Sequence, residues 1–228
     1  MIPLRIEIDL ATPWVPPTYG VHLDGLIAWA VADQCMTDPD CTQAAIDAAV
    51  DALPLARHVG QEGGWCWKAS LFTVVDPGRL HRHFATAKTD AGRMASGLVD
   101  GLIRGKKTVD LVRGMSKSDL YRFTTQNASQ LHAWCVGDEA LIAQLLSRVQ
   151  HVGGRGRLGF GAIRRNSNDE AAIRVIPDDT KRDGVFRWER RHQPEPPKQT
   201  GFVPIEGRCI PPYWHSAAGQ RVWRPVDA

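Results

Sequence analysis

The first ten residues alternate between apolar and polar side chains, and this alternation constrains the fold more than any other feature. The apolar positions are Ile2, Leu4, Ile6, Ile8 and Leu10, and the polar positions between them include Arg5, Glu7 and Asp9. Because successive side chains of a strand point to opposite faces, one face of this segment is apolar and the other is polar. The sequence therefore predicts a half-buried strand at the start of the chain.

Periodic segments after this strand predict further helices and strands. The predicted helices cover about 23–31, 42–53 and 138–151, and the predicted strands cover 65–75, 130–136, 162–163 and 171–176. In chain order these elements give a βαββαβ pattern with insertions. That order is typical of an α+β fold of the ferredoxin-like (RNA-recognition-like) type.

Two segments lie outside this pattern. Residues 79–125 are basic and glycine-rich, and their apolar runs are too short for a separate core, so we expect an insertion that is partly helical and partly mobile. From residue 177 onward prolines and dispersed aromatic residues predict an extension that wraps the main domain, with its aromatic side chains as pins. The expected organisation is a main domain over 1–176, which includes the basic insertion 79–125, and a C-terminal extension over 177–228.

Composition excludes several classes of protein. The 228 residues are 43% hydrophobic and 23% charged, and no run approaches the roughly 20 apolar residues of a membrane-spanning helix. Charged residues at positions 5, 7 and 9 interrupt any signal peptide. Five scattered cysteines without a CxxC pair indicate neither a disulfide framework nor a cysteine zinc site. We expect a cytoplasmic protein with no membrane partner, no metal and no cofactor.

Charge is distributed unevenly along the chain, although the net charge is only +3. Residues 1–78 carry 3 Lys and Arg against 10 Asp and Glu, whereas residues 79–165 carry 15 against 6. The excess of cations in the central block would attract a polyanion such as a nucleic acid. Two alternatives stay open: a solvated basic face, or a basic face docked against the acidic N-terminal third.

A glycine-rich segment follows the predicted helix 138–151. Gly154, Gly156 and Gly159 match the GxGxxG fingerprint, but that fingerprint needs a strand before it and a helix after it, and the order here is reversed. A nucleotide-binding metabolic enzyme is therefore disfavoured. Glycine permits close backbone approach and arginine suits phosphates, so the candidate contacts to a sugar-phosphate backbone are Gly153, Gly154, Arg155, Gly156 and Arg157. The alternative is a tight connection with two solvated arginines.

Other candidate nucleic-acid contacts combine cations, hydroxyl groups and aromatic rings. Trp65 and Trp67 share a strand face and either stack on bases or pack in the core. The candidates outside the glycine-rich segment are Lys106, Lys107, Arg113, Lys117, Tyr121, Arg122, Trp67, Ser70 and Arg82. No GxSxG, HExxH or paired-carboxylate signature occurs, so no catalytic residue and no metal ligand is predicted. His81 and His83 are interpreted as basic surface residues beside an anionic partner.

Several segments together resemble a known family. In chain order they are LATPW, HLDGLIAWAVA, LPLARH, GWCWKAS, KKTVDLVRGMSKSDLYRF, HAWCVGDEALIAQLL and VGGRGRLGFGAI, and they lie within about residues 1–176. They are similar to the RAMP superfamily of CRISPR proteins, and most closely to the type IV effector subunit that plays the role of the fifth Cas family. The resemblance implies a ferredoxin-like core with a thumb-like insertion.

The resemblance also implies a function. Such a subunit caps the 5′ handle of a CRISPR RNA (crRNA) beside a backbone (filament) subunit and a large subunit, with target DNA as a further candidate partner. Residues 153–161 correspond by position to the family's glycine-rich loop, and 106–122 to an insertion that contacts RNA or the neighbouring backbone subunit. Because a separate endonuclease usually processes RNA in type IV systems, the resemblance implies a noncatalytic subunit. The alternative is a metal-independent endoribonuclease in which His58, His81, His83 or Tyr121 removes the 2′-OH proton.

Overall fold

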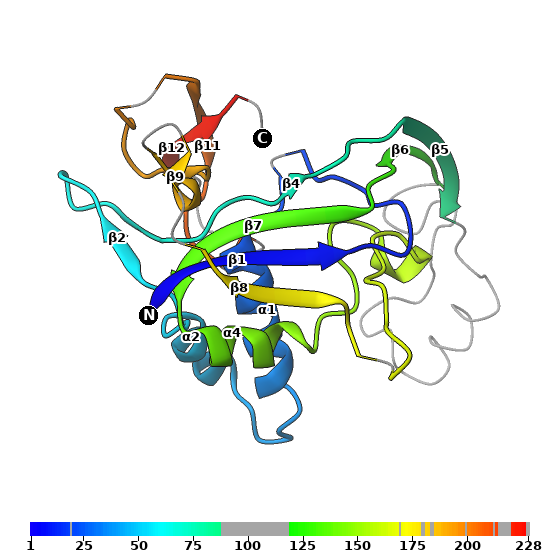
Figure 1. Cartoon of the computed structure of the whole chain (residues 1–228), viewed down its shortest axis with the longest axis horizontal. Helices are drawn as coiled ribbons and strands as arrows, with labels where there is room; N and C mark the ends of the chain where they lie inside the picture. Colours follow the sequence, from blue (N-terminus) through cyan, green and yellow to red (C-terminus); the bar gives the residue numbers. More distant parts are fainter. Residues whose placement is uncertain are drawn as a thin grey trace, which may run out of the picture. The chain divides into compact units, whose positions relative to one another are not determined.

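The computed structural model describes residues 1–18, 20–87, 119–168, 170–178, 181–182, 185–198, 200–211, 213 and 220–226. The chain divides into two compact units: a larger unit of Met1–Arg79 with Gln126–Ala228, and a smaller unit of Leu80–Thr125. It is an α+β protein with antiparallel sheets and few helices (Figure 1). No helix among the described residues is long and apolar enough to cross a membrane.

A four-stranded sheet with the order β4-β7-β1-β8 organises the larger unit. β1 (Ile2–Asp9) pairs antiparallel with β7 (Gln130–Gly137) on one side and with β8 (Ile173–Pro177) on the other. β4 (Thr73–Val74) pairs with the outer side of β7. The predicted N-terminal strand is therefore confirmed, and it lies in the interior of the sheet with partners on both sides.

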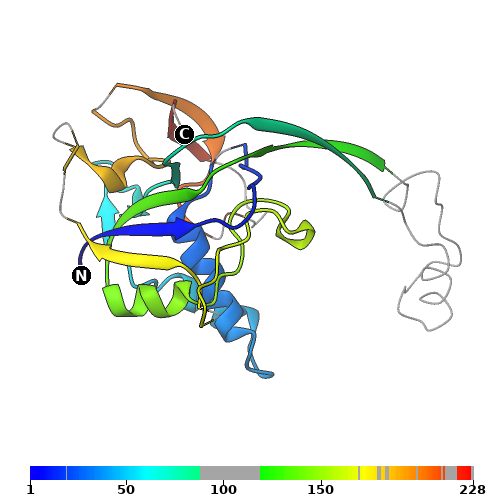
Figure 2. The same ribbon diagram turned by 45° about the vertical axis from the view of Figure 1, so that its right-hand side comes forward.

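Three helices cover one face of this sheet, as Figures 1 and 2 show. They are α1 (Leu23–Cys35), α2 (Gln43–Val50) and α4 (Glu139–Leu146). The apolar alternation of β1 explains their position, because Leu4, Ile6 and Ile8 are fully buried in the core. Thr42 and Asp138 cap α2 and α4 by accepting hydrogen bonds from backbone amides three residues on. All three predicted helices occur, although α4 ends five residues before the predicted boundary.

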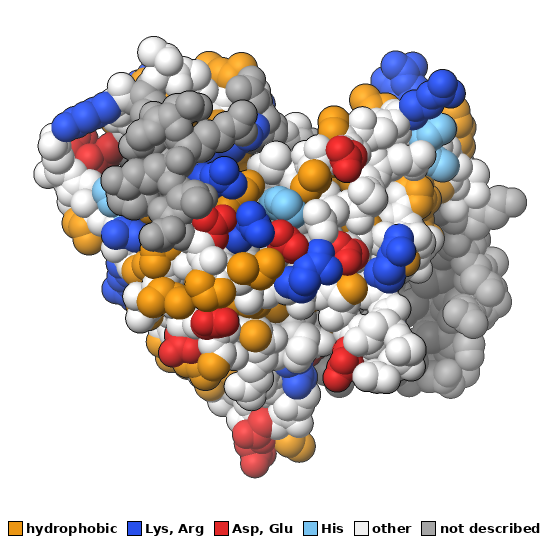
Figure 3. All heavy atoms as spheres, in the orientation of Figure 1, with side chains coloured by type: hydrophobic (Ala, Val, Ile, Leu, Met, Phe, Trp, Pro, Cys, Tyr) orange, Lys and Arg blue, Asp and Glu red, His pale blue; other side chains and the backbone are white. Residues whose placement is uncertain are grey.

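The opposite face of the sheet carries charges that neutralise one another. Arg174 forms ion pairs with Glu7 at 2.9 Å and with Asp9 at 3.0 Å, and Arg5 forms one with Glu7 at 3.0 Å. In Figure 3, acidic and basic side chains are intermixed over this part of the surface. The open face of the sheet is therefore not a cationic surface of the kind that attracts phosphates.

The predicted strand 65–75 is divided into two strands. β3 (Trp65–Trp67) pairs with β2 (Arg57–Val59), whereas β4 belongs to the main sheet. Between them, Ala69 forms an isolated bridge with Cys135 of β7. The apolar run 65–75 therefore contributes to two different sheets. The periodicity within this segment does not show where one strand ends and the next begins.

The C-terminal segment contains strands as well as loops. β9 (Lys181–Arg182) pairs with β10 (Val185–Phe186), the short helix η3 (Arg187–Glu189) follows, and β11 (Phe202–Gly207) pairs with β12 (Gln220–Pro225). Cys209 and Val222 form a small buried cluster with Cys66 of β3. Trp188 is buried, as expected of an aromatic pin.

The smaller unit contains a two-stranded sheet of β5 (Leu80–Ala87) and β6 (Asp119–Gln126). The sequence analysis assigned no strand to these residues, and that part of its prediction for 79–125 is wrong. β-Branched and aromatic residues such as Tyr121, Phe123 and Thr125 favour strands, but the surrounding glycines and charges obscured this signal. The predicted contacts Lys106, Lys107, Arg113 and Lys117 lie outside the described residues.

A fully buried arginine connects the C-terminal segment to the core. The guanidinium of Arg191 donates to the Asp24 carboxylate of α1 at 3.1 Å and to the Ala69 carbonyl at 3.1 Å. It also donates to the carbonyls of Trp67 and Cys209. In this polar cluster the buried charges have partners on α1, on the segment around β3 and on the C-terminal segment, so the arginine joins all three.

Removing this guanidinium should destabilise the protein strongly. In Arg191→Leu the Asp24 carboxylate stays buried without its partner, so we expect the free energy of unfolding to fall by about 3–5 kcal/mol. Arg148→Ala is the matched control, because it breaks an exposed ion pair with Asp33 (3.0 Å) and should cost less than about 1 kcal/mol. Urea unfolding of both variants measures the difference. Equal losses would contradict a structural role for the buried pair.

His192, next to this arginine, makes stability depend on pH. Burial lowers the pKa of His192 from 6.5 to about 4, and Arg191 adds to this effect. The unfolded chain therefore binds protons more readily between these values, and stability is lost as the pH falls from about 6.5 toward 4. We expect this residue to lower the free energy of unfolding by about 2 kcal/mol at pH 5 relative to pH 7.5.

The test compares His192→Asn with His58→Asn, which alters a histidine of β2 outside the polar cluster. Urea unfolding at pH 7.5 and at pH 5 should show a smaller loss in His192→Asn than in the native chain, and the native loss in His58→Asn. An unchanged loss in His192→Asn would show that another group causes the pH dependence.

Candidate nucleic-acid interface

The glycine-rich loop, residues 153–161, is held in place by backbone hydrogen bonds. The Gly154 amide donates to the Val15 carbonyl at 2.9 Å, and the Gly161 amide donates to the Pro13 carbonyl at 2.8 Å. Residues 13–15 follow β1, so the loop is attached to the chain that leaves this interior strand. The loop is therefore an ordered part of the larger unit.

The glycines are explained by close approach within the protein. Gly161 has a φ of 65°, and a Cβ atom there would overlap the Val152 carbonyl oxygen. Gly153 has a φ of 87°, and a Cβ atom there would lie 2.7 Å from the Val15 oxygen. The sequence analysis expected these residues to allow approach to another chain, whereas the structure uses them to bring the loop against its own neighbours.

The amides of the loop are used largely inside the protein. Those of Gly154, Leu158, Gly159 and Gly161 all donate to backbone carbonyls. These four amides therefore already have hydrogen-bond partners within the protein. The candidate contacts that remain are mainly side chains.

Two exposed arginines dominate the outer side of the loop. Arg155 adopts a left-handed backbone conformation with a φ of 64°, which costs about 1–2 kcal/mol for a residue with a side chain. Arg157 lies in the single turn η2 (Gly156–Leu158), and no carboxylate of the described residues pairs with it. We call Arg155 and Arg157 the loop arginines. Their exposed positions agree with the sequence prediction, although their contact with RNA stays a prediction.

One face of the β5–β6 sheet is exposed and combines cations with apolar side chains. His83 contacts Thr125 through a 2.9 Å hydrogen bond and stacks on Phe123, with 5.4 Å between ring centroids, so the odd-numbered residues of both strands share a face. The even-numbered residues lie on the other face, which we call the hairpin face. It contains Leu80, Arg82, Phe84, Leu120 and Arg122.

The chemistry of the hairpin face suits single-stranded nucleic acid. Phe84 is 70% exposed, and among the described residues no carboxylate pairs with Arg82 or Arg122. An exposed ring stacks on a base, and unneutralised guanidinium groups attract phosphates. The sequence analysis identified both arginines as candidate contacts but did not identify Phe84. Once residues 80–87 are assigned to a strand, the alternation of side chains places Phe84 on the same face as Arg82.

Two predicted RNA contacts lie in the interior, which corrects the sequence analysis. Trp67 is only 3% exposed and belongs to the hydrophobic core, with the Arg57 guanidinium 4.9 Å from its ring centroid. Ser70 is fully buried, and its hydroxyl donates to the Leu71 carbonyl at 2.8 Å and accepts from the Trp134 amide at 2.9 Å. The core alternative considered for the tryptophans is therefore right for Trp67.

The residues considered for catalysis are distributed over both units of the chain. His58 lies on β2 with its ring 5.3 Å from that of Trp188. His81, His83 and Tyr121 belong to the β5–β6 sheet. Among the described residues, no group of three or more histidine, cysteine or acidic side chains is arranged to hold a metal ion.

Comparison with known proteins identifies the family. The family model for Csf3, described as a CRISPR type IV associated protein, matches residues 2–225. No curated protein gives a significant match. The family match extends through the C-terminal segment, beyond the region on which the resemblance was recognised in the sequence, and it confirms the similarity to a type IV CRISPR subunit. The chain belongs to the Csf3 family of CRISPR type IV associated proteins.

Proposed function

We propose that this chain is a noncatalytic RNA-binding subunit of a type IV CRISPR ribonucleoprotein, which caps the 5′ handle of the crRNA and joins the backbone and large subunits. The observation that supports this most directly is the contrast between two groups of arginines. Arg5 and Arg174 on the sheet are neutralised by Glu7 and Asp9, whereas no carboxylate of the described residues pairs with Arg82, Arg122 or Arg157.

The fold is consistent with this function. The order β1-α1-β4-β7-α4-β8 along the chain and β4-β7-β1-β8 across the sheet supports a ferredoxin-like (RNA-recognition-like) core. The open face of such a sheet often stacks on bases, but here the guanidinium groups of Arg5 and Arg174 are paired with Glu7 and Asp9 and are not available to phosphates. The RNA contacts are therefore proposed at the loop arginines and at the hairpin face.

The proposed mechanism is electrostatic holding with stacking. The loop arginines and Arg82 with Arg122 bind phosphates, which releases condensed counterions and makes affinity depend on salt. Phe84 stacks on one base, a contact that tolerates any base because every base has a π-face. Phosphate contacts position the strand without reading its sequence.

The salt dependence of RNA binding tests the phosphate contacts. For the double variant Arg155→Ala/Arg157→Ala we expect weaker binding to a single-stranded repeat RNA. The slope of log K against log salt should become shallower by up to about 1.4, which corresponds to two contacts on a single strand. Arg174→Ala is the control, because its guanidinium is held by two carboxylates and should leave the slope unchanged. A folded double variant with the native slope would remove the loop arginines from the proposed interface.

A cleavage assay separates the proposal from the endoribonuclease alternative. The purified chain is incubated with repeat RNA in the presence of a chelator, and the products are resolved on a denaturing gel. We expect the RNA to stay at full length in a salt-sensitive complex. A specific cut that disappears in His81→Ala, His83→Ala or His58→Ala would instead assign the chain to the metal-independent endoribonucleases.

A further inference from the structure

Two of the five cysteines form a pair in the connection between α1 and α2. Cys35 is the last residue of α1, and Cys41 lies two residues before the start of α2. Both thiols are free, and both residues are partly accessible to solvent. The residues between them, 36–40, are all exposed. A thiol reagent in solution therefore reaches this pair without unfolding of the core.

Hydrogen bonds fold this connection back on itself. The Asp38 amide donates to the Cys35 carbonyl at 3.0 Å, and the Cys41 amide donates to the Asp38 carbonyl at 3.1 Å. Each of these bonds closes a turn of four residues. The Asp38 carboxylate also accepts from the Asp40 amide at 3.0 Å, a contact typical of turns. Two successive turns therefore separate the cysteines, and hydrogen bonds fix the course of the chain between them.

The two cysteine side chains contact each other. Partial burial raises the pKa of the Cys41 thiol, and the charges of Cys35 and Asp38, together with a hydrogen bond between the two cysteine side chains, raise it further. That hydrogen bond places the two sulfur atoms next to each other. A disulfide forms without strain only where the backbone already brings two cysteines together, and this connection does so.

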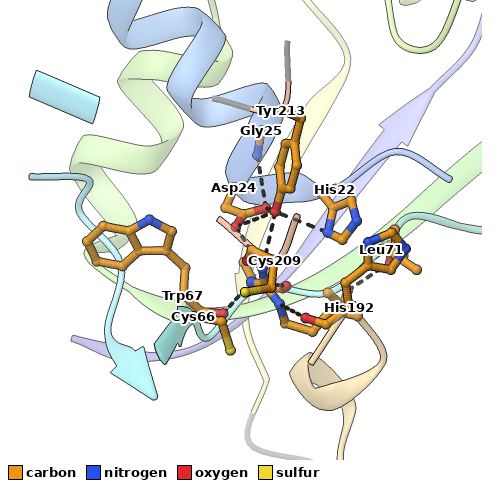
Figure 4. Close-up of polar contacts among 12 residues, drawn as sticks. His22, Asp24, Gly25, Cys66, Trp67, Leu71, His192, Cys209 and Tyr213 are labelled. Carbon is orange, nitrogen blue, oxygen red and sulfur yellow. Dashed lines mark hydrogen bonds and ion pairs between the residues drawn. The ribbon is translucent and has the colours of Figure 1, made fainter. Parts of the chain in front are cut away.

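The other three cysteines are shielded from such a reaction. Cys66, Cys135 and Cys209 are buried, and Cys66 and Cys209 lie among the residues of the buried polar cluster (Figure 4). Burial raises the pKa of the Cys66 thiol to about 11 and that of the Cys135 thiol to about 12. Because the thiolate is the attacking form, buried thiols with raised pKa values react slowly near pH 7. An oxidant should therefore select the pair in the α1–α2 connection.

We propose that Cys35 and Cys41 are a modification site, at which an organic disulfide such as oxidised glutathione converts the two thiols into an intramolecular disulfide. This inference does not depend on the proposed RNA contacts. The bridge would close the connection between α1 and α2 into a covalent loop.

The reaction is a two-step thiol–disulfide exchange. The thiolate of one cysteine attacks a sulfur atom of oxidised glutathione, which releases one reduced glutathione and leaves a mixed disulfide on the protein. The thiolate of the second cysteine then attacks the protein sulfur atom of that mixed disulfide and releases a second reduced glutathione. Two protein thiols are oxidised, one glutathione disulfide is reduced, and the two protons end on the released glutathione thiols. Excess reduced glutathione reverses both steps.

Oxidation of the full chain tests the site. The folded native chain is incubated with oxidised glutathione, and its remaining thiols are then alkylated in denaturant and counted by mass spectrometry. We expect two of the five cysteines to resist alkylation and the chain to lose two hydrogens, about 2 Da. Proteolytic cleavage before Asp38 and Asp40 should give fragments that carry Cys35 and Cys41 and stay joined until a reductant is added.

Variants separate an internal disulfide from modification of single thiols. In Cys35→Ser and in Cys41→Ser the remaining thiol has no partner, so we expect one stable glutathione adduct per chain in place of the bridge. Cys135→Ala is the control, because it removes a buried cysteine and should keep the bridge. The proposal would be overturned by five alkylated cysteines after oxidation, by a bridge that includes a buried cysteine, or by separate adducts on Cys35 and Cys41 of the native chain.

Discussion

The buried pair of Arg191 and Asp24 holds the larger unit together. Two opposite charges out of contact with water are tolerated only when each has partners, and here the guanidinium reaches carbonyl groups on either side of the pair. Tyr213 donates to the same carboxylate at 3.0 Å and stacks on His22. The ring of His22 is thus packed against a tyrosine that the charge pair holds in place.

In the proposed function, charge neutralisation decides which arginines can contact a nucleic acid. Counting cations along the chain identifies a basic central block, but the ion pairs of Arg174 show that a basic residue does not always contribute a positive surface. Arg82 and Arg122 on the β5–β6 sheet and Arg157 in the glycine-rich loop have no carboxylate partner among the described residues. The partners of individual arginines therefore indicate where the surface is positive more reliably than the net charge of a segment does.

Local patterns in the sequence predicted the local structure well. The alternation in β1 and the helical periodicity of residues 42–53 and 138–151 are properties of neighbouring residues, and a strand or a helix occurs at each of these places. Contacts between distant residues were not predictable in this way. Nothing near Arg191 in the sequence indicates that its partner is Asp24, 167 positions away, and nothing near Ser70 indicates that its hydroxyl bonds the backbone of β7.

The position of the glycine-rich loop, residues 153–161, also depends on contacts between residues that are distant in the sequence. The hydrogen bonds from Gly154 and Gly161 to residues 13–15 fix it to the chain beyond β1. An already ordered loop loses little conformational entropy when a ligand binds, whereas a disordered arginine-rich segment must lose it at that moment. The entropy of ordering this surface was lost when the protein folded. A ligand bound there would therefore dissociate more slowly than a ligand that makes the same contacts with a disordered segment.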